Sequence, residues 1–376
     1  MKNKIWKLIG LLTIMVFVLS AVNSVHAQTT ISDGIGVYPS GIAYNPSTNQ
    51  VYAVNPYAGT ISVIQDSTNE VIQTITGLSA TPHDLAYDSG TKAMYISTDD
   101  GVDVVPDKSN NVTATIPVAN GCVGIAYASG QNEIYVSYEY STKVAVISDS
   151  SNTIVKNITM PEYPGSMTYD KTQNEIFVSE GNPYTGNVAV ITASHEIHTT
   201  ISVGGVGSGP GSVVYDSVKN SIYVTNSTTV SIISDSNNKI SKVISNVGAA
   251  GSLVYDKTDG KIFCSNGQVI SDSTNSVVAT LTVGTSPAGI AYDSDTGSIY
   301  VTNGNDPGTV TVNLVSSGTP STENPTSSAL SSSTSTPTPA VPEFSSAALV
   351  AVAAAMIALT VSAVTLKSRT RKTLQK

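Results

Sequence analysis

The chain has 376 residues, two cysteines and a formal net charge of −9. All 27 acidic residues lie between Asp33 and Glu343, together with ten lysines and no arginine, so this middle part carries −17 and the two ends carry +8. Nucleic-acid binding requires a basic face, so this charge distribution excludes it. Two cysteines in a chain of this length also exclude a small disulfide-stapled protein.

Residues 1–27 have the pattern of a secretory signal peptide. Three lysines precede an apolar run over residues 8–22, and the small residues near Ala27 provide a cleavage site after that residue. The alternative is a retained anchor helix, which the short apolar run and the cleavage site disfavour. We therefore expect the chain to be exported and residues 1–27 to be removed.

The other end of the chain has three parts. Residues 316–344 are rich in Ser, Thr and Pro, a composition that cannot bury a core and predicts a disordered stalk. Residues 345–366 carry no charge and are long enough to form a single transmembrane helix. Residues 367–376 are basic, and the positive-inside rule places them in the cytoplasm. The sequence thus predicts a cell-surface ectodomain held by a C-terminal membrane anchor.

Pro342, Glu343 and Phe344, followed by the apolar segment and the basic tail, resemble the PEF-type C-terminal sorting signals of archaeal surface proteins. Such signals usually continue with glycine, and Ser345 stands at that position in this chain. The resemblance covers about 35 residues. It implies a sorting step, and it leaves open whether the helix is retained or is cut off and replaced by a lipid.

Between these ends, residues 28–315 repeat one unit seven times. A tyrosine recurs at intervals of 37 to 46 residues, and a second aromatic residue follows each one at a fixed offset of eight. A fixed offset in seven pairs indicates an internal repeat. The pairs are Tyr44 and Tyr52, Tyr87 and Tyr95, Tyr127 and Tyr135, Tyr169 and Phe177, Tyr215 and Tyr223, Tyr255 and Phe263, and Tyr292 and Tyr300.

Each unit is predicted to form four short strands, which we designate A to D. Residues 289–292 and 299–302 are typical of strands A and B, and residues 144–147 and 153–155 are typical of strands C and D. These segments are rich in β-branched and aromatic residues and are separated by Asn, Asp, Gly and Ser turns. Four-stranded units of about 40 residues are typical of β-propeller blades. We therefore predict an all-β, seven-bladed β-propeller with four-stranded antiparallel blades.

The last unit lacks a fourth strand, because residues 310–315 run directly into the predicted stalk. Residues 29–32 align with residues 281–283, at the end of the sixth unit. Residues 38–41, which follow them, align with residues 286–289, at the start of the seventh unit. We therefore expect an N-terminal strand to complete the last blade. Closing the ring in this way removes the open sheet edges that would otherwise promote aggregation.

The second strands spell a recurrent motif, YVTN, at residues 223–226 and 300–303, with variants at residues 52–55 and 263–266. With this motif and its period, residues 29–315 are similar to the YVTN-repeat β-propellers of surface-layer and secreted proteins. The resemblance implies a cell-surface protein. Two local departures are a shortened sixth blade near Gly267 and a fourth blade whose C–D turn contains His195.

Six tyrosines fall outside the repeated strand positions, and all of them map to D–A or B–C connections, which share one face of a propeller. Exposed tyrosine is common at recognition surfaces because its ring is amphipathic and loses little entropy on contact. We therefore hypothesise that this tyrosine-rich, acidic sector, mainly on blades 1, 3 and 4, binds cell-surface glycans or envelope proteins. The alternative is that these tyrosines seal neighbouring blades. The candidate binding residues are Tyr38, Tyr57, His83, Asp84, Tyr138, Glu139, Tyr140, Tyr163 and Tyr184, with Asp99, Asp100, Glu162 and Glu180 nearby.

Catalysis is not predicted, because the chain shows no nucleophile elbow, no cofactor fingerprint and no arginine in its body. The alternative is an extracellular lyase or metal-dependent oxidoreductase with its site at the funnel mouth near His83 and Asp84. His195 and His198 have ligand-like spacing, but their rings need not converge in a turn, so no metal site is predicted there. The acidic A–B turns are explained by turn chemistry, with calcium binding at most weak, on the order of millimolar. No cofactor is expected.

Two further predictions concern covalent chemistry. Cys122 and Cys264 belong to blades on opposite sides of the ring, farther apart than the roughly 7 Å that a disulfide tolerates, so two free thiols are expected. Three acceptor sequons make Asn111, Asn157 and Asn226 candidate glycosylation sites. Together these features predict an exported, membrane-anchored surface protein that acts as a non-catalytic binding, adhesion or envelope structural module.

Overall fold

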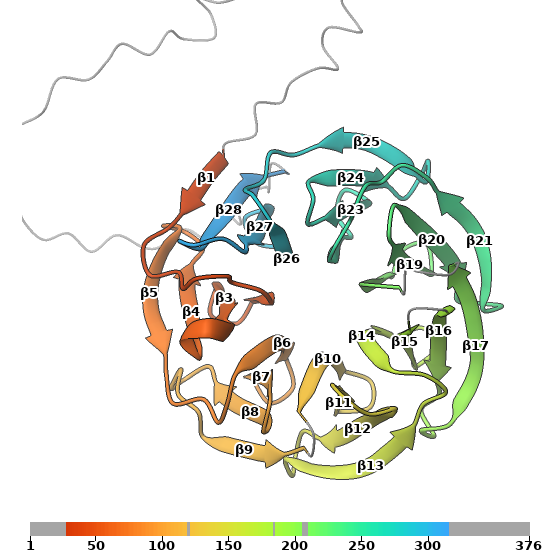
Figure 1. Ribbon diagram of the computed structural model, residues 1–376, viewed down its shortest axis with the longest axis horizontal. Helices are drawn as coiled ribbons and strands as arrows, with labels where there is room; N and C mark the ends of the chain where they lie inside the picture. The colour runs from red at the N-terminus through yellow and green to blue at the C-terminus, as the bar shows by residue number, and fades with distance from the viewer. Residues whose placement is uncertain (1–27, 119–120, 183–184, 205–209, 316–376) are drawn as a thin grey trace, which may run out of the picture. The chain divides into compact units, whose positions relative to one another are not determined.

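The computed structural model describes residues 28–118, 121–182, 185–204 and 210–315. These residues form seven four-stranded antiparallel sheets arranged around a central axis (Figure 1). The predicted seven-bladed β-propeller is therefore confirmed. Each sheet is one blade, and in six of the seven blades the strands follow one another in chain order from strand A beside the axis to strand D at the rim.

The strand bounds are as follows. Blade 1 comprises β2 (Ile42–Asn45), β3 (Gln50–Asn55), β4 (Thr60–Gln65) and β5 (Glu70–Ile75), and blade 2 comprises β6 (Pro82–Asp88), β7 (Ala93–Thr98), β8 (Gly101–Pro106) and β9 (Ala114–Pro117). Blade 3 comprises β10 (Cys122–Ala128), β11 (Glu133–Tyr138), β12 (Lys143–Ser148) and β13 (Thr153–Thr159), and blade 4 comprises β14 (Pro164–Asp170), β15 (Glu175–Asn182), β16 (Thr185–Ile191) and β17 (Ile197–Gly204). Blade 5 comprises β18 (Val213–Asp216), β19 (Ser221–Asn226), β20 (Thr229–Ser234) and β21 (Lys239–Ile244), and blade 6 comprises β22 (Leu253–Asp256), β23 (Lys261–Cys264), β24 (Gln268–Ser271) and β25 (Ser276–Thr280). A short 3-10 helix, η1 (Pro56–Ala58), lies in the β3–β4 connection.

Blade 7 is built from both ends of the propeller. Its strands are β26 (Pro287–Asp293), β27 (Ser298–Asn303) and β28 (Thr309–Leu314), and the outermost position is taken by β1 (Gln28–Ile31). β1 pairs antiparallel with β28, with Gln28 opposite Asn313 and Ile31 opposite Val310. The N-terminal strand therefore closes the ring, as the alignment of the repeat predicts.

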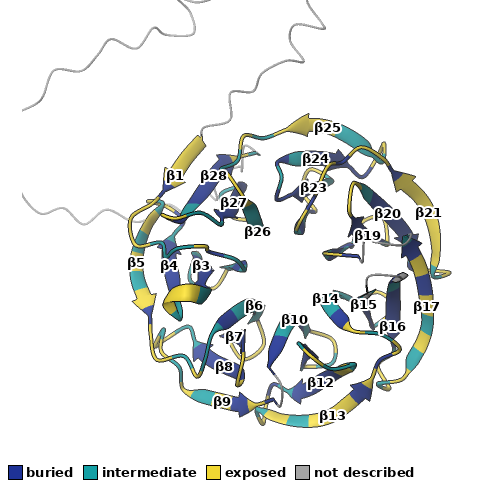
Figure 2. Cartoon of the chain, in the orientation of Figure 1, coloured by how far each residue is buried: buried dark blue, intermediate teal, exposed yellow. Residues whose placement is uncertain are grey.

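The core lies between neighbouring blades. Strands B and C are almost completely buried, whereas the outer strands alternate between exposed and covered residues, as the yellow segments at the rim of Figure 2 show. The buried apolar residues form seven clusters, and each cluster combines side chains from two adjacent blades. Apolar burial of this kind is the main favourable term in folding, so every blade is stabilised by both of its neighbours.

Turn chemistry accounts for the acidic A–B turns. In blade 7 the carboxylate of Asp293 accepts hydrogen bonds from the backbone N–H groups of Asp295 (2.8 Å) and Thr296 (3.2 Å). Asp88, Asp170, Asp216 and Asp256 make the same two bonds in four other blades, and Asn45 of blade 1 makes the first of them. All five residues are fully buried. Blade 3 has Ala128 at this position.

In blades 1, 2, 5 and 7 the tyrosine of strand B joins the blade to the next one. Its hydroxyl donates to an asparagine side chain in the following C–D turn, and that asparagine has a positive φ, which asparagine tolerates better than most residues. The observed pairs are Tyr52 with Asn110 (2.7 Å), Tyr95 with Asn152 (2.8 Å), Tyr223 with Asn275 (2.7 Å) and Tyr300 with Asn69 (2.8 Å).

No helix in the described part of the chain is long and apolar enough to cross a membrane. The predicted signal peptide at residues 1–27, stalk at 316–344, transmembrane helix at 345–366 and basic tail at 367–376 all lie outside the described residues.

Candidate functional site

The inner strands surround a central cavity of about 450 Å³ at the mouth of the channel. Its wall consists almost entirely of Gly, Ser, Ala and Val side chains, and the exceptions are His83 and Asp84 in blade 2. Small residues are required because neighbouring inner strands approach closely. For example, a Cβ added to Gly41 would lie 2.9 Å from the Asp84 carboxylate, and one added to Gly289 would collide with the Ser40 carbonyl.

A hydroxyl on strand B holds adjacent inner strands together. Thr302 Oγ1 accepts from the N–H of Gly289 (2.8 Å) and donates to the carbonyl of Ser40 in the next blade (2.5 Å). Ser97 makes the corresponding bonds with Asp84 and Val123. This role explains why the third position of the YVTN motif carries a hydroxyl side chain. In blade 2, the Ser97 hydroxyl also holds in place the residues of β6 that line the channel.

Among the described residues that line this cavity, Asp84 is the only one with a carboxylate. Desolvation by the surrounding protein raises its pKa to about 7, although the Leu85 N–H, 2.9 Å from Oδ1, and the nearby His83 act in the opposite direction. Burial therefore disfavours the ionised form of the Asp84 carboxyl.

A second hollow, of about 650 Å³, opens on the upper face between blades 2 and 3; we use "upper face" for the face that carries the D–A and B–C connections. His83 comes from β6, Asp99 and Asp100 from the β7–β8 connection, and Glu139 and Tyr140 from the β11–β12 connection. Gly121, just before β10, completes the lining. None of the six lining residues is a lysine or an arginine.

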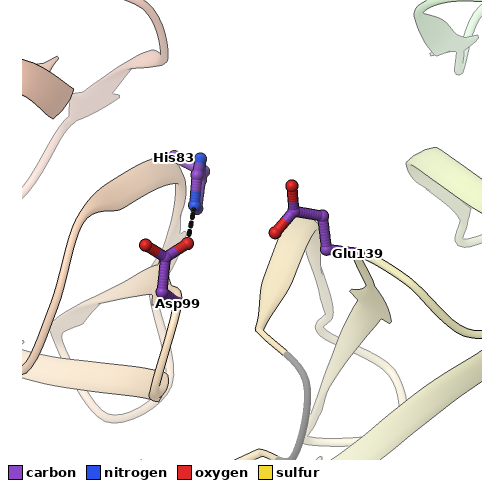
Figure 3. Close-up of side chains that lie close together, drawn as sticks. All are labelled: His83, Asp99 and Glu139. Carbon is purple, nitrogen blue, oxygen red and sulfur yellow. Dashed lines mark hydrogen bonds and ion pairs between the residues drawn. The ribbon is translucent and has the colours of Figure 1, made fainter.

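Three of these side chains converge, as Figure 3 shows. His83 Nε2 lies 2.6 Å from Asp99 Oδ1, and the Glu139 carboxylate points toward this pair from across the hollow. One potential ligand atom from each residue lies within 4.8 Å of the others. The bond from His83 lowers the pKa of the Asp99 carboxyl, and the Glu139 carboxylate raises the pKa of the exposed Tyr140 hydroxyl.

The residues of this hollow are departures from the repeat. Four residues after the strand B aromatic, only blades 2 and 3 carry a carboxylate, at Asp99 and Glu139; the equivalent residues are Pro56, Gly181, Ser227, Gly267 and Gly304. At the position of His83 the other blades have Ser40, Val123, Gly165, Gly211, Gly251 and Ala288. The fold therefore brings together side chains that the architecture of the blade does not require.

Four of the tyrosine candidates are exposed on the upper face. Tyr57 and Tyr140 are 78% and 76% exposed, and Tyr38 and Tyr163 are about half exposed. The rings of Tyr38 and Tyr57 are in contact, with centroids 5.0 Å apart and planes inclined at 48°. Tyr184 lies outside the described residues.

Tyr138 does not belong to this exposed set. Its side chain is only 5% exposed, packs within the apolar cluster between blades 2 and 3, and donates from its hydroxyl to Asn157 Oδ1 (2.6 Å). It occupies the last residue of β11, which points into the blade interface. Tyr138 therefore fits the alternative role of sealing neighbouring blades, and not a role in recognition.

Asn226 is unsuited to glycosylation for a similar reason. It is 7% exposed, and its side-chain nitrogen donates to the carbonyl of Val203 (2.9 Å). It is the asparagine of a YVTN motif, and its amide holds β19 to β17, the outer strand of blade 4. Asn111 and Asn157 are exposed, so glycosylation at these two positions stays a prediction.

The two remaining histidines of the propeller serve separate contacts. His195, with φ 63°, takes the place of the usual C–D turn asparagine in blade 4, and its Nε2 lies 2.9 Å from Glu133. His198 Nδ1 lies 2.9 Å from Glu175. Within the described ranges, the only group of three potential metal ligands is His83, Asp99 and Glu139. No metal site was predicted from the sequence at these three residues; their shared departure from the repeat is the signal that distinguishes them there.

Comparison with known proteins adds information on the fold alone. No family model matches the chain, and no curated protein matches it. Among solved structures, a chain of hydrazine synthase from Kuenenia stuttgartiensis is similar, with a TM-score of 0.67 and 16% identity over 79% of this chain and 99% of that chain. The similarity supports the propeller architecture. The resemblances to YVTN-repeat proteins and to PEF-type signals stay predictions.

Proposed function

We propose that this protein is an exported, membrane-anchored cell-surface propeller that recognises a glycan or an envelope protein without catalysis. The observation that carries the proposal is the placement of Tyr38, Tyr57, Tyr140 and Tyr163. All four are exposed, all lie on the upper face, and none is required by the repeat. By contrast, the strand B aromatics are completely or almost completely buried.

The chemistry of this face suits a sugar or a neutral to cationic protein surface. A tyrosine ring offers an apolar face for packing and a hydroxyl for hydrogen bonding, and carboxylates accept hydrogen bonds from sugar hydroxyls. The acidic propeller would repel an anionic partner at long range. The predicted signal peptide, stalk and transmembrane helix support placement of this face outside the cell.

The test uses the purified full chain, glycans isolated from the cell envelope and immobilised envelope proteins. We expect saturable binding, and we expect the Tyr57→Ala and Tyr140→Ala variants to lower the affinity at least tenfold with little change in the thermal midpoint. Val218→Ala is a matched control, because Val218 is also exposed but lies in an A–B turn on the opposite face. Unchanged affinity in both tyrosine variants would remove the basis of the proposal.

The second candidate is a propeller enzyme acting at the funnel mouth. One observation favours it: among the described residues that line the central cavity, His83 and Asp84 are the only ionisable ones, and they are adjacent in β6. Turnover of envelope polysaccharides by the full chain, abolished in Asp84→Asn, would favour catalysis over pure recognition.

A further inference from the structure

The hollow between blades 2 and 3 contains a set of side chains with the composition of a metal site. His83 provides an imidazole nitrogen, and Asp99 and Glu139 provide one carboxylate each. Two carboxylates and a neutral imidazole together balance the charge of a divalent cation. Sets of one or two histidines with carboxylates are typical of first-row transition cations, whereas calcium prefers six to eight oxygen ligands.

The distances are compatible with a shared ion. Ligands at about 2.1 Å from a metal lie about 3 to 3.5 Å apart when adjacent and about 4.2 Å apart when opposite. The separations observed here start at 2.6 Å for His83 and Asp99 and stay within 4.8 Å for the whole set. Small side-chain rotations would therefore bring all three groups to one ion, which would replace the bond between His83 and Asp99.

The backbone holds the two carboxylate-bearing loops in place. The N–H of Asp99 donates to the carbonyl of Thr81 (3.1 Å), and the N–H of Glu139 donates to the carbonyl of Gly121 (3.3 Å). Gly121 has a φ of +70°, and a Cβ there would lie 3.3 Å from the Glu139 carboxylate. A glycine at this position thus allows the Glu139 side chain to approach the D–A connection and the hollow.

We propose that His83, Asp99 and Glu139 bind one divalent first-row transition cation between blades 2 and 3, with Zn²⁺ as the reference ion. Three protein ligands leave at least one coordination position free, and Tyr140 lines the same hollow. This position would accept a hydroxyl or carboxylate oxygen of the bound partner. The inference rests on the proposed recognition function, and it explains how an acidic hollow without lysine or arginine can hold an electron-rich group.

The metal site is tested without any partner. The purified full chain is freed of metal with a chelator and titrated with ZnCl₂, and in a separate titration with CaCl₂, by calorimetry. We expect one Zn²⁺ per chain and at least tenfold weaker binding of Ca²⁺. The variants His83→Ala, Asp99→Asn and Glu139→Gln should each weaken Zn²⁺ binding at least tenfold, while the matched control His198→Ala leaves it unchanged.

Several outcomes would overturn the site. These are the absence of saturable one-to-one Zn²⁺ binding, binding that survives both His83→Ala and Glu139→Gln, and calcium affinity equal to that for zinc. Since Asp99→Asn and Glu139→Gln preserve side-chain size, they keep the test informative even where His83→Ala disturbs folding.

Partner binding is then measured with and without chelator. Zinc binding without any partner binding would support the metal site and contradict the recognition function. Partner binding that depends on Tyr57 and Tyr140 but is unchanged by the chelator would support recognition and overturn the role of the metal in it.

Discussion

At the scale of single residues, four of the five strand B tyrosines donate to an asparagine in the C–D turn of the following blade, whereas Tyr135 donates to Gln131 and Glu133 of its own blade. A buried tyrosine hydroxyl needs a hydrogen-bond acceptor, whereas the phenylalanines of blades 4 and 6 have no hydroxyl. Phe263 precedes blade 7, whose strands β28 and β1 come from opposite ends of the propeller and are not joined by a turn. Phe177 precedes blade 5, which does have the turn asparagine, Asn238, and the Oδ1 atom of that residue is buried without a partner. Of the two phenylalanines, therefore, only Phe177 leaves a hydrogen bond unmade.

We predict that Phe177→Tyr stabilises the protein by about 1 kcal/mol, because the new hydroxyl can donate to Asn238 Oδ1. Chemical denaturation of the full chain measures the change in the free energy of unfolding. Phe263→Tyr is the matched control and should give no gain, since no C–D turn follows it. Equal effects of the two substitutions would contradict this explanation.

Glu180 is a buried acid at the position where most blades have the asparagine of the YVTN motif. It is fully buried, its Oε1 accepts from the N–H of Glu162 (3.2 Å), and its Oε2 has no hydrogen-bond partner. Burial raises the pKa of this carboxyl. A raised pKa means that the ionised form is less favourable in the folded state than in the unfolded chain, so Glu180 destabilises the protein at neutral pH.

We predict that Glu180→Gln increases stability at pH 7 by about 1 kcal/mol, on the scale of an unsatisfied buried group. The penalty is present above the folded-state pKa and is relieved as the pH falls through it. The gain from the substitution should therefore shrink toward pH 4. Thermal unfolding at a series of pH values gives the measurement, with the exposed Glu70→Gln as the comparison. A gain that grows on acidification would contradict the assignment.

At the scale of elements, the four-residue strand β1 closes the ring of blades. It provides the outer strand of blade 7, and its last residue, Ile31, is 5% exposed and packs in the apolar cluster between blades 7 and 1. Because β1 and β28 are far apart in the chain, their pairing closes a loop that includes the whole propeller. Such a contact forms at a large entropic cost and depends on side-chain burial to remain closed.

We predict that Ile31→Ala lowers the free energy of unfolding by about 2 to 4 kcal/mol, the usual cost of removing a buried aliphatic side chain. Thr29→Ala, in the same strand but exposed, should cost less than 1 kcal/mol. Denaturation midpoints of the two variants provide the comparison. Similar losses in both would mean that the backbone pairing of β1, rather than the burial of Ile31, holds the ring closed.

At the scale of the whole molecule, the seven apolar clusters form a closed ring in which no described blade has a free face. A closed ring couples the blades, because opening one interface exposes apolar surface on two of them. Both cysteines are free and almost completely buried in this ring, and burial raises the pKa of the Cys122 and Cys264 thiols to about 12.

We therefore predict that neither thiol reacts with a thiol reagent in the folded protein at pH 8, because the reactive thiolate is almost absent and inaccessible. Both should react on unfolding, in a single transition that coincides with the loss of β-structure. Titration of thiols across a denaturation curve makes this measurement. Rapid labelling of Cys122 or Cys264 under native conditions would show that a blade interface opens locally.

Much of this architecture could be predicted from the sequence. The fixed spacing of the aromatic pairs determined the number of blades, and the truncated last unit together with residues 29–32 determined the closing strand. These features are periodic, and a period survives in the sequence because every blade must satisfy the same packing and turn geometry. The burial of the strand B aromatics follows from the same requirement.

The candidate site depended on the tertiary structure. His83, Asp99 and Glu139 are separated in the chain and lie in two blades, and only the paths of the loops determine that they meet while His195 and His198 do not. The burial of Tyr138 and Asn226 was likewise decided by which way the last residue of strand B points. The sequence by itself thus determined the ring, because a repeat records local geometry. The tertiary structure alone decided which irregular residues converge on its upper face, because convergence depends on contacts between blades.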